Sequence, residues 1–203
     1  MTDVAALRKL FEAEAERDRP ESDRPDVGII MGSDSDLDVM AGAGEALDEL
    51  GFVELTDYDD PPAAEYTYES WVVSAHRTPD LLYAYAETAP DRGLDVILAG
   101  AGGKSADLPN MTASIAYPIP VIGIPVQEKS VDSVLGMPKG APITAVDAGK
   151  SFNAALSAVQ ILARTDETLR ERLVERQETQ AADVATVSES LHRQGTTAFR
   201  ESR

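Results

Sequence analysis

Four short segments combine glycine with hydroxyl, carboxylate or basic side chains in a way that could bind and transform a small anionic molecule. They are residues 32–36 (GSDSD), 74–77 (SAHR), 100–105 (GAGGKS) and 136–140 (GMPKG). The first three directly follow short apolar runs that read as strands. Ligands of an open α/β sheet bind outside the carboxyl ends of its strands, so these three segments should share one pocket. The fourth follows a short helix, so this rule alone does not place it there.

The first segment has the composition of a phosphate-binding turn. Gly32 lets the backbone turn sharply and approach a ligand closely, and the amides of a helix N-terminus favour an anion. Ser33 and Ser35 add hydroxyl donors, and Asp36 is an acceptor suited to ribose hydroxyls. Taken alone, the same residues could simply cap a helix. The segment is neither a Walker loop nor a full GxGxxG fingerprint.

The second and third segments add a proton carrier, a cation and a flat surface. His76 is the only histidine of the expected core, and an imidazole can move protons near neutral pH. Its neighbour Arg77 can pair with a phosphate or a carboxylate, and Ser74 lies beside both. Gly102 and Gly103 let a loop lie against a planar ligand. The alternatives are a histidine that only bonds a loop and a glycine turn without function. Together the segments predict a site for a nucleotide-monophosphate-like ligand and a proton transfer.

The elements that must position these segments alternate between strand and helix. Apolar runs predict strands at 27–31, 71–73, 95–99, 121–124 and 143–146, and helical spacing predicts helices after 36, from 78 and over 151–163. Apolar strands separated by helices are typical of a parallel sheet covered on both faces. The chain is therefore expected to form one doubly wound α/β domain, which we place at residues 27–165.

Three regions do not follow this alternation of strands and helices. Residues 1–26 are expected to be a polar N-terminal extension with a short amphipathic helix. Residues 52–70 form an acidic link that is much longer than ordinary connections of about 2–6 residues, so we expect a surface insertion. Residues 166–203 are expected to form a charged helix followed by a polar tail, which packs on a neighbouring subunit.

Composition excludes several classes of function. The 203 residues contain no cysteine and two histidines, which excludes thiolate chemistry and disfavours a metal site. The formal charge of −18 would repel nucleic acids and anionic membranes. No apolar stretch has the roughly 18 residues of a membrane span, and no targeting segment is visible, so we expect a cytoplasmic protein. Acidity spread along the whole chain indicates a cytoplasm of very high salt.

Five motifs in order make the chain similar to a known family. The runs 31–36 (MGSDSD), 74–79 (SAHRTP), 99–103 (AGAGG), 121–126 (VIGIPV) and 137–140 (MPKG) resemble the N5-carboxyaminoimidazole ribonucleotide mutases of purine biosynthesis. The resemblance covers roughly residues 27–165. It implies a flavodoxin-like three-layer α/β/α fold, a homo-octamer, a ribonucleotide substrate, and a reaction without metal, ATP or another cofactor.

The resemblance also implies roles for residues. Ser33 and Asp36 would hold the phosphate and ribose of the substrate, Arg77 would bind it as well, and His76 would be the catalytic histidine. The family reaction moves a carboxylate from N5 to carbon 4 of the imidazole. It is drawn as release of carbon dioxide in a closed site, attack by carbon 4, and a proton shuttle through the histidine. A dry pocket would keep the carbon dioxide from escaping.

One position departs from the family pattern. Mutases of this class have a histidine two residues before the Pro of a His-Leu-Pro run, where this chain has Asp107. We expect Asp107 to cap the helix that begins at Leu108, or else to pair with Lys104, and the capping interpretation predicts a nearly silent Asp107→Asn change. The pair Lys104 and Ser105 instead resembles a related class that carboxylates aminoimidazole ribonucleotide directly with carbon dioxide. A non-catalytic nucleotide-binding module is the third alternative, because fold does not determine function.

Overall fold

The computed structural model describes residues 3–202 and divides the chain into two compact units. The first unit ends at Ile161, and the second runs from Leu162 toward the C-terminus. The first unit holds the sheet and the four glycine-containing segments at 32–36, 74–77, 100–105 and 136–140. The second holds two helices.

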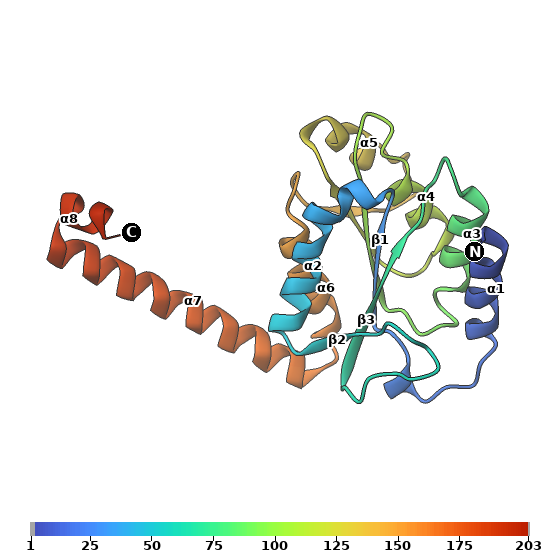
Figure 1. Ribbon diagram of the computed structural model, residues 1–203, viewed down its shortest axis with the longest axis horizontal. Coiled ribbons are helices and arrows are strands. Elements are labelled where there is room, and N and C mark those ends of the chain that lie inside the picture. The colour runs from blue at the N-terminus through green and yellow to red at the C-terminus, as the bar shows by residue number, and fades with distance from the viewer. Residues whose placement is uncertain (1–2, 203) are drawn as a thin grey trace. The chain divides into compact units, whose positions relative to one another are not determined.

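A single parallel sheet forms the centre of the first unit (Figure 1). Its strands are β1 (Val27–Met31), β2 (Phe52–Glu54), β3 (Tyr66–Val72), β4 (Val96–Ala101), β5 (Val121–Pro125) and β6 (Thr144–Ala145). They lie in the order β2-β3-β1-β4-β5-β6, and every neighbouring pair is parallel. The order reverses at β1, so the sheet is doubly wound and the expected flavodoxin-like α/β architecture is confirmed.

Helices cover both faces of this sheet, as Figure 1 shows. On one face lie α2 (Leu37–Glu49) and α6 (Ser151–Leu162), joined by a hydrogen bond from Ser151 Oγ to the carbonyl of Val39. On the other lie α3 (Pro79–Thr88) and α4 (Leu108–Ile115), with α1 (Val4–Ala15) against α3. The short helix α5 (Val131–Leu135) contacts β5. Strands β1, β4 and β5 are buried at every residue, which is why their sequences read as continuous apolar runs.

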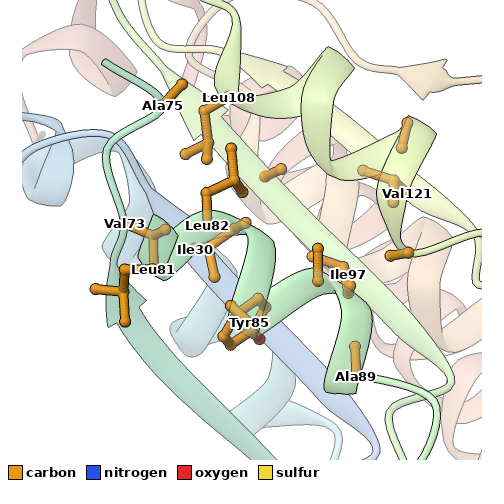
Figure 2. Packing of buried hydrophobic residues seen from close by; sticks show 14 of the residues in the cluster. Ile30, Val73, Ala75, Leu81, Leu82, Tyr85, Ala89, Ile97, Leu108 and Val121 are labelled. Carbon is orange, nitrogen blue, oxygen red and sulfur yellow. The ribbon is translucent and has the colours of Figure 1, made fainter. Parts of the chain in front are cut away.

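The apolar layer between the sheet and α3 fixes the strand ends that carry the site (Figure 2). Ile30 and Ile97 point from neighbouring strands toward Leu82 and Tyr85 of α3, and all four side chains are fully buried. Leu108, the first residue of α4, is 1% exposed in the same cluster. The packing therefore holds the loop after β4 at both of its ends.

The N-terminal segment is part of this core, so the expectation of a separate polar extension is wrong. Asp3 caps α1 by accepting the amide of Ala6 at 2.7 Å. Phe11 is completely buried, and its ring meets Trp71 and Tyr85 edge-on at centroid distances of 5.0 and 5.2 Å. Leu7, one turn earlier on the same helix, is partly buried against the same cluster.

The acidic link is shorter than expected, because β3 begins at Tyr66 rather than at Trp71. Its Glu69 is 1% exposed and pairs at 2.6 Å with Arg92, which is equally buried. Tyr58 of the link donates its hydroxyl to the same carboxylate, and the Arg92 guanidinium lies 4.9 Å from the Phe11 ring centroid. A buried ion pair thus ties α1, the link and β3 together, and only residues 55–65 remain as irregular insertion between β2 and β3.

The second unit contains α7 (Glu167–Gln194) and α8 (Thr196–Glu201). Asp166 caps α7 through the amide of Leu169 at 2.9 Å, and Gly195 separates the two helices with a φ of 77°. Helix occupies most of residues 166–203, where a charged helix and a polar tail were expected. Among residues 3–202, no helix has both the length and the apolar character needed to cross a bilayer.

Candidate active site

A cavity of about 450 Å³ opens at the carboxyl ends of β1, β3 and β4, beside the point where the strand order reverses. All residues predicted to form the site line it. They are Gly32, Ser33, Ser35, Asp36, Ser74, His76, Arg77, Gly102 and Gly103. Three segments that lie far apart in the sequence therefore meet in one pocket, at the position where doubly wound sheets bind ligands.

The loop after β1 is preorganised by its own side chains. Ser33 Oγ accepts the amide of Ser35 at 3.4 Å and donates to Asp34 at 3.0 Å, which starts a short 3-10 turn over Asp34–Asp36. Helix α2 continues directly from this turn. The positive end of the helix dipole thus faces the pocket, which favours a phosphate at the loop.

Asp36 is the acid buried deepest in the pocket wall, with 6% of its surface exposed. Burial raises the pKa of its carboxyl above the ordinary value, and the Arg77 guanidinium opposes that shift. Gly102 allows this close packing, because a Cβ at that position would lie only 3.1 Å from Asp36 Oδ1. A buried acceptor against two glycine loops is suited to a ligand hydroxyl that replaces water.

Arg77 is held in place before any ligand binds. Its Nη2 donates to the carbonyl of Gly32 at 2.7 Å, and its Nε donates to Ser74 Oγ at 3.3 Å. Ser74 is itself held, because its amide donates to Thr78 Oγ1 at 3.0 Å. These bonds connect the ends of β1 and β3 and place a fixed cation at the rim of the pocket.

The imidazole of His76 contacts a carboxylate that the sequence did not pair with it. Its Nε2 lies 2.8 Å from Asp107 Oδ2. Asp107 occupies the N-cap position of α4, but its side chain makes no capping bond, and its ion-pair partner is His76 rather than Lys104. Both sequence-based expectations for Asp107 are therefore wrong.

Ser105 and Asp107, from the loop after β4 that the sequence had singled out, also line the cavity. Sequence reasoning missed Gln127 and Lys129, which belong to the segment after β5. The last two follow a buried strand of the same parallel sheet, and that signal could have found them. The segment 136–140 does not line the cavity, and its Met137 packs against the hydrophobic core instead.

The pocket mixes charges of both signs. Arg77 and Lys129 line it together with Asp36 and Asp107. Within residues 3–202, no three histidine or acidic side chains gather as a set of metal ligands. The arrangement can bind an anion and a polyol, and it can exchange a proton through one imidazole.

Comparisons with known proteins identify the family of the chain and support its fold. The family model described as AIR carboxylase matches residues 26–183. A Bacillus subtilis protein named N5-carboxyaminoimidazole ribonucleotide mutase is 45% identical over 176 residues, which are 83% of this chain and 99% of that protein. A Mycobacterium tuberculosis protein of the same name is 45% identical over 86% of this chain and 94% of its own length. The crystal structure of Treponema denticola PurE has a TM-score of 0.67 at 23% identity, and the match covers 83% of this chain and 99% of that structure, which supports the fold.

Proposed function

Because the chain belongs to the AIR carboxylase family, we propose that it is an isomerase of purine biosynthesis. It converts N5-carboxyaminoimidazole ribonucleotide into 4-carboxy-5-aminoimidazole ribonucleotide. The observation that carries this proposal is the 45% identity to the Bacillus subtilis mutase across nearly the whole length of that protein. The pocket supports it independently, because it combines an anion site, a buried acceptor and one imidazole.

The substrate is bound by residues from three loops. The hydroxyls of Ser33 and Ser35 and the end of the helix dipole face its phosphate, together with Arg77. Asp36 accepts from the ribose hydroxyls, and the imidazole ring lies against the backbone of Gly102 and Gly103. Support comes from the burial of Asp36 and from the closeness of its carboxylate to both glycine-containing loops, since a Cβ added at Gly32 or Gly102 would lie 3.6 or 3.1 Å from its oxygens.

The reaction needs no redox partner, since the carboxylate only changes position. The bond between N5 and the carboxylate carbon breaks and releases carbon dioxide, and the electron pair stays on the aminoimidazole. Carbon 4 then attacks the carbon dioxide and forms the new carbon–carbon bond. The proton of carbon 4 leaves to His76, and N5 gains a proton, so that substrate and product have the same composition. His76 serves as the acid–base group of this transfer.

Retention of carbon dioxide requires a site closed to water. The His76 side chain is 62% exposed in the isolated subunit. We therefore propose that the bound substrate and neighbouring subunits of a homo-octamer complete the enclosure. A cytoplasmic location belongs to the same proposal.

One observation favours a second candidate, the direct carboxylation of aminoimidazole ribonucleotide by carbon dioxide. The loop after β4 carries Lys104 and Ser105, and an aspartate stands at position 107 where a mutase histidine is expected. In that reaction carbon 4 attacks carbon dioxide taken from solution, and the carbon 4 proton leaves to the same imidazole.

An isotope experiment separates the two reactions. The enzyme receives N5-carboxyaminoimidazole ribonucleotide labelled with ¹³C in its carboxylate, in buffer that contains unlabelled bicarbonate. A mutase gives product that keeps the label, and it turns over aminoimidazole ribonucleotide with carbon dioxide poorly. Efficient use of the latter with no use of the N5-carboxylated compound contradicts the mutase proposal. His76→Asn is the inactive control, and His192→Gln, which alters the other histidine of the chain, is the matched active control.

A further inference from the structure

The contact between His76 and Asp107 joins two elements that approach each other only in the folded chain. His76 lies in the loop after β3, and Asp107 lies 31 residues later at the start of α4. The 2.8 Å separation of Nε2 and Oδ2 is typical of a charge-assisted hydrogen bond. Both side chains line the cavity.

The backbone on either side of each residue is anchored, so the contact does not depend on two mobile loops. Next to Asp107, the Leu108 side chain is 1% exposed in the core, and the amide of Ala106 donates to Ser133 Oγ at 3.0 Å. Next to His76, Ala75 is 9% exposed, and Arg77 is bonded to Ser74 and Gly32. The imidazole and the carboxylate are therefore presented to each other by rigid elements.

The chemistry of the pair fixes the state of the imidazole ring. An ionised carboxylate only accepts hydrogen bonds, so Nε2 must carry the hydrogen that points at Asp107. In the neutral ring Nδ1 then has the free lone pair and is the nitrogen that can take a proton. When Nδ1 becomes protonated, the adjacent carboxylate stabilises the imidazolium.

From this geometry we propose that Asp107 is a positioning residue for His76. It holds the ring in one orientation and in the Nε2–H form. Nδ1 is then the ring nitrogen that takes the proton released by carbon 4. The inference rests on the proposed function, because it concerns the proton that carbon 4 releases. Asp107 acts through His76 and does not itself exchange a proton with the substrate.

A double-mutant cycle tests whether Asp107 acts through His76. Asp107→Ala is expected to lower kcat by about 10–100-fold, by analogy with the loss of a carboxylate that orients a metal-bound histidine, and to change KM by less than about threefold. His76→Asn lowers kcat further, and adding Asp107→Ala to it has no further effect. If the fold-losses in kcat of the two single variants multiply in the double variant, or if Asp107→Ala raises only KM, Asp107 contacts the substrate directly. Either result would overturn the proposal.

Two further variants distinguish loss of the orienting contact from a general loss of stability or of negative charge. Asp107→Asn has nearly the same shape but carries an amide that can donate to Nε2 and so favour the wrong ring form. It is expected to lose kcat while its melting temperature stays within about 2 °C of the unmodified protein. Asp132→Ala removes an exposed acid from the nearby helix α5 and should leave turnover within about twofold.

A spectroscopic measurement tests the contact without any substrate. The chain has two histidines, so His192→Gln leaves His76 as the only imidazole to observe by ¹⁵N–¹H correlation. In alkaline buffer the spectrum should show Nε2–H alone, and Asp107→Ala should produce a mixture with Nδ1–H. Unchanged ring spectra in Asp107→Ala would overturn the proposal. If neither ribonucleotide is turned over, the proposed function fails, and this spectrum still decides whether Asp107 holds the ring.

Discussion

Truncation of Phe11 to alanine measures whether helix α1 is a structural part of the domain. The Phe11 side chain is fully buried, stacks edge-on against Trp71 and Tyr85, and lies under the Arg92 guanidinium. Replacing a buried phenylalanine by alanine costs about 3–5 kcal/mol. In a domain of this size each kcal/mol lowers the melting temperature by about 2–4 °C, so a fall of roughly 6–20 °C is expected.

The assay uses the only tryptophan of the chain, which lies in the contact itself. Urea unfolding is followed by Trp71 emission and by circular dichroism, at one protein concentration and one salt concentration, since association would shift the midpoint. A slope of about 1–3 kcal/mol per molar urea converts the loss into a midpoint shift of at least about 1 M. Val4→Ala, at a 39% exposed position of the same helix, should leave the midpoint unchanged. A Phe11→Ala loss below about 1 kcal/mol would mean that α1 frays independently of the domain.

Three other predictions concern catalysis, protonation and assembly. His76→Asn should keep the fold and the oligomer but lose about 10²–10⁴-fold in turnover, and near-normal activity would contradict its assignment. Burial raises the pKa of Asp26 from 3.8 to about 6. Between pH 3.8 and pH 6 its carboxyl is therefore protonated in the folded chain but ionised in the unfolded chain. The free energy of unfolding therefore falls as pH rises through this window. Asp26→Asn should remove that part of the pH dependence and add on the order of 2–3 kcal/mol at pH 7, as urea titrations at pH 4, 5, 6 and 7 would test. With −18 charges per subunit, the proposed octamer should need molar salt, because the Debye length grows from about 3 Å at 1 M to about 30 Å at 0.01 M. Light scattering across a KCl series that finds the same particle in dilute buffer would refute this expectation.

The parts of the site that could be predicted are those with local causes. Gly32, Ser33 and Asp36 form a turn whose hydrogen bonds lie within a few residues of each other. Such turn chemistry is visible in a short window of sequence. The topology then brought the three loops together, because parallel strands place their carboxyl ends at one edge of the sheet.

What the sequence did not reveal depends on contacts between distant residues. The acidic character of residues 52–70 suggested a surface loop, yet Glu69 is a buried strand residue because Arg92 neutralises it. Phe11 contributes one aromatic ring to a helix that is otherwise polar enough to pass for an appendage. Asp107 had two plausible partners in its own segment, and the folded chain supplied a third, His76, from another loop.

The edge strands of the sheet limit how copies of this protein can associate. The strands at its two edges, β2 and β6, have three and two residues. A strand this short offers too few free backbone groups to template pairing with another chain, and Glu54 adds a charge to one of these edges. Fibre-like growth and strand exchange between molecules are thereby disfavoured, even in crowded or strongly salting-out solutions. Association has to proceed through side chains on helices and loops, where charge and salt can regulate it.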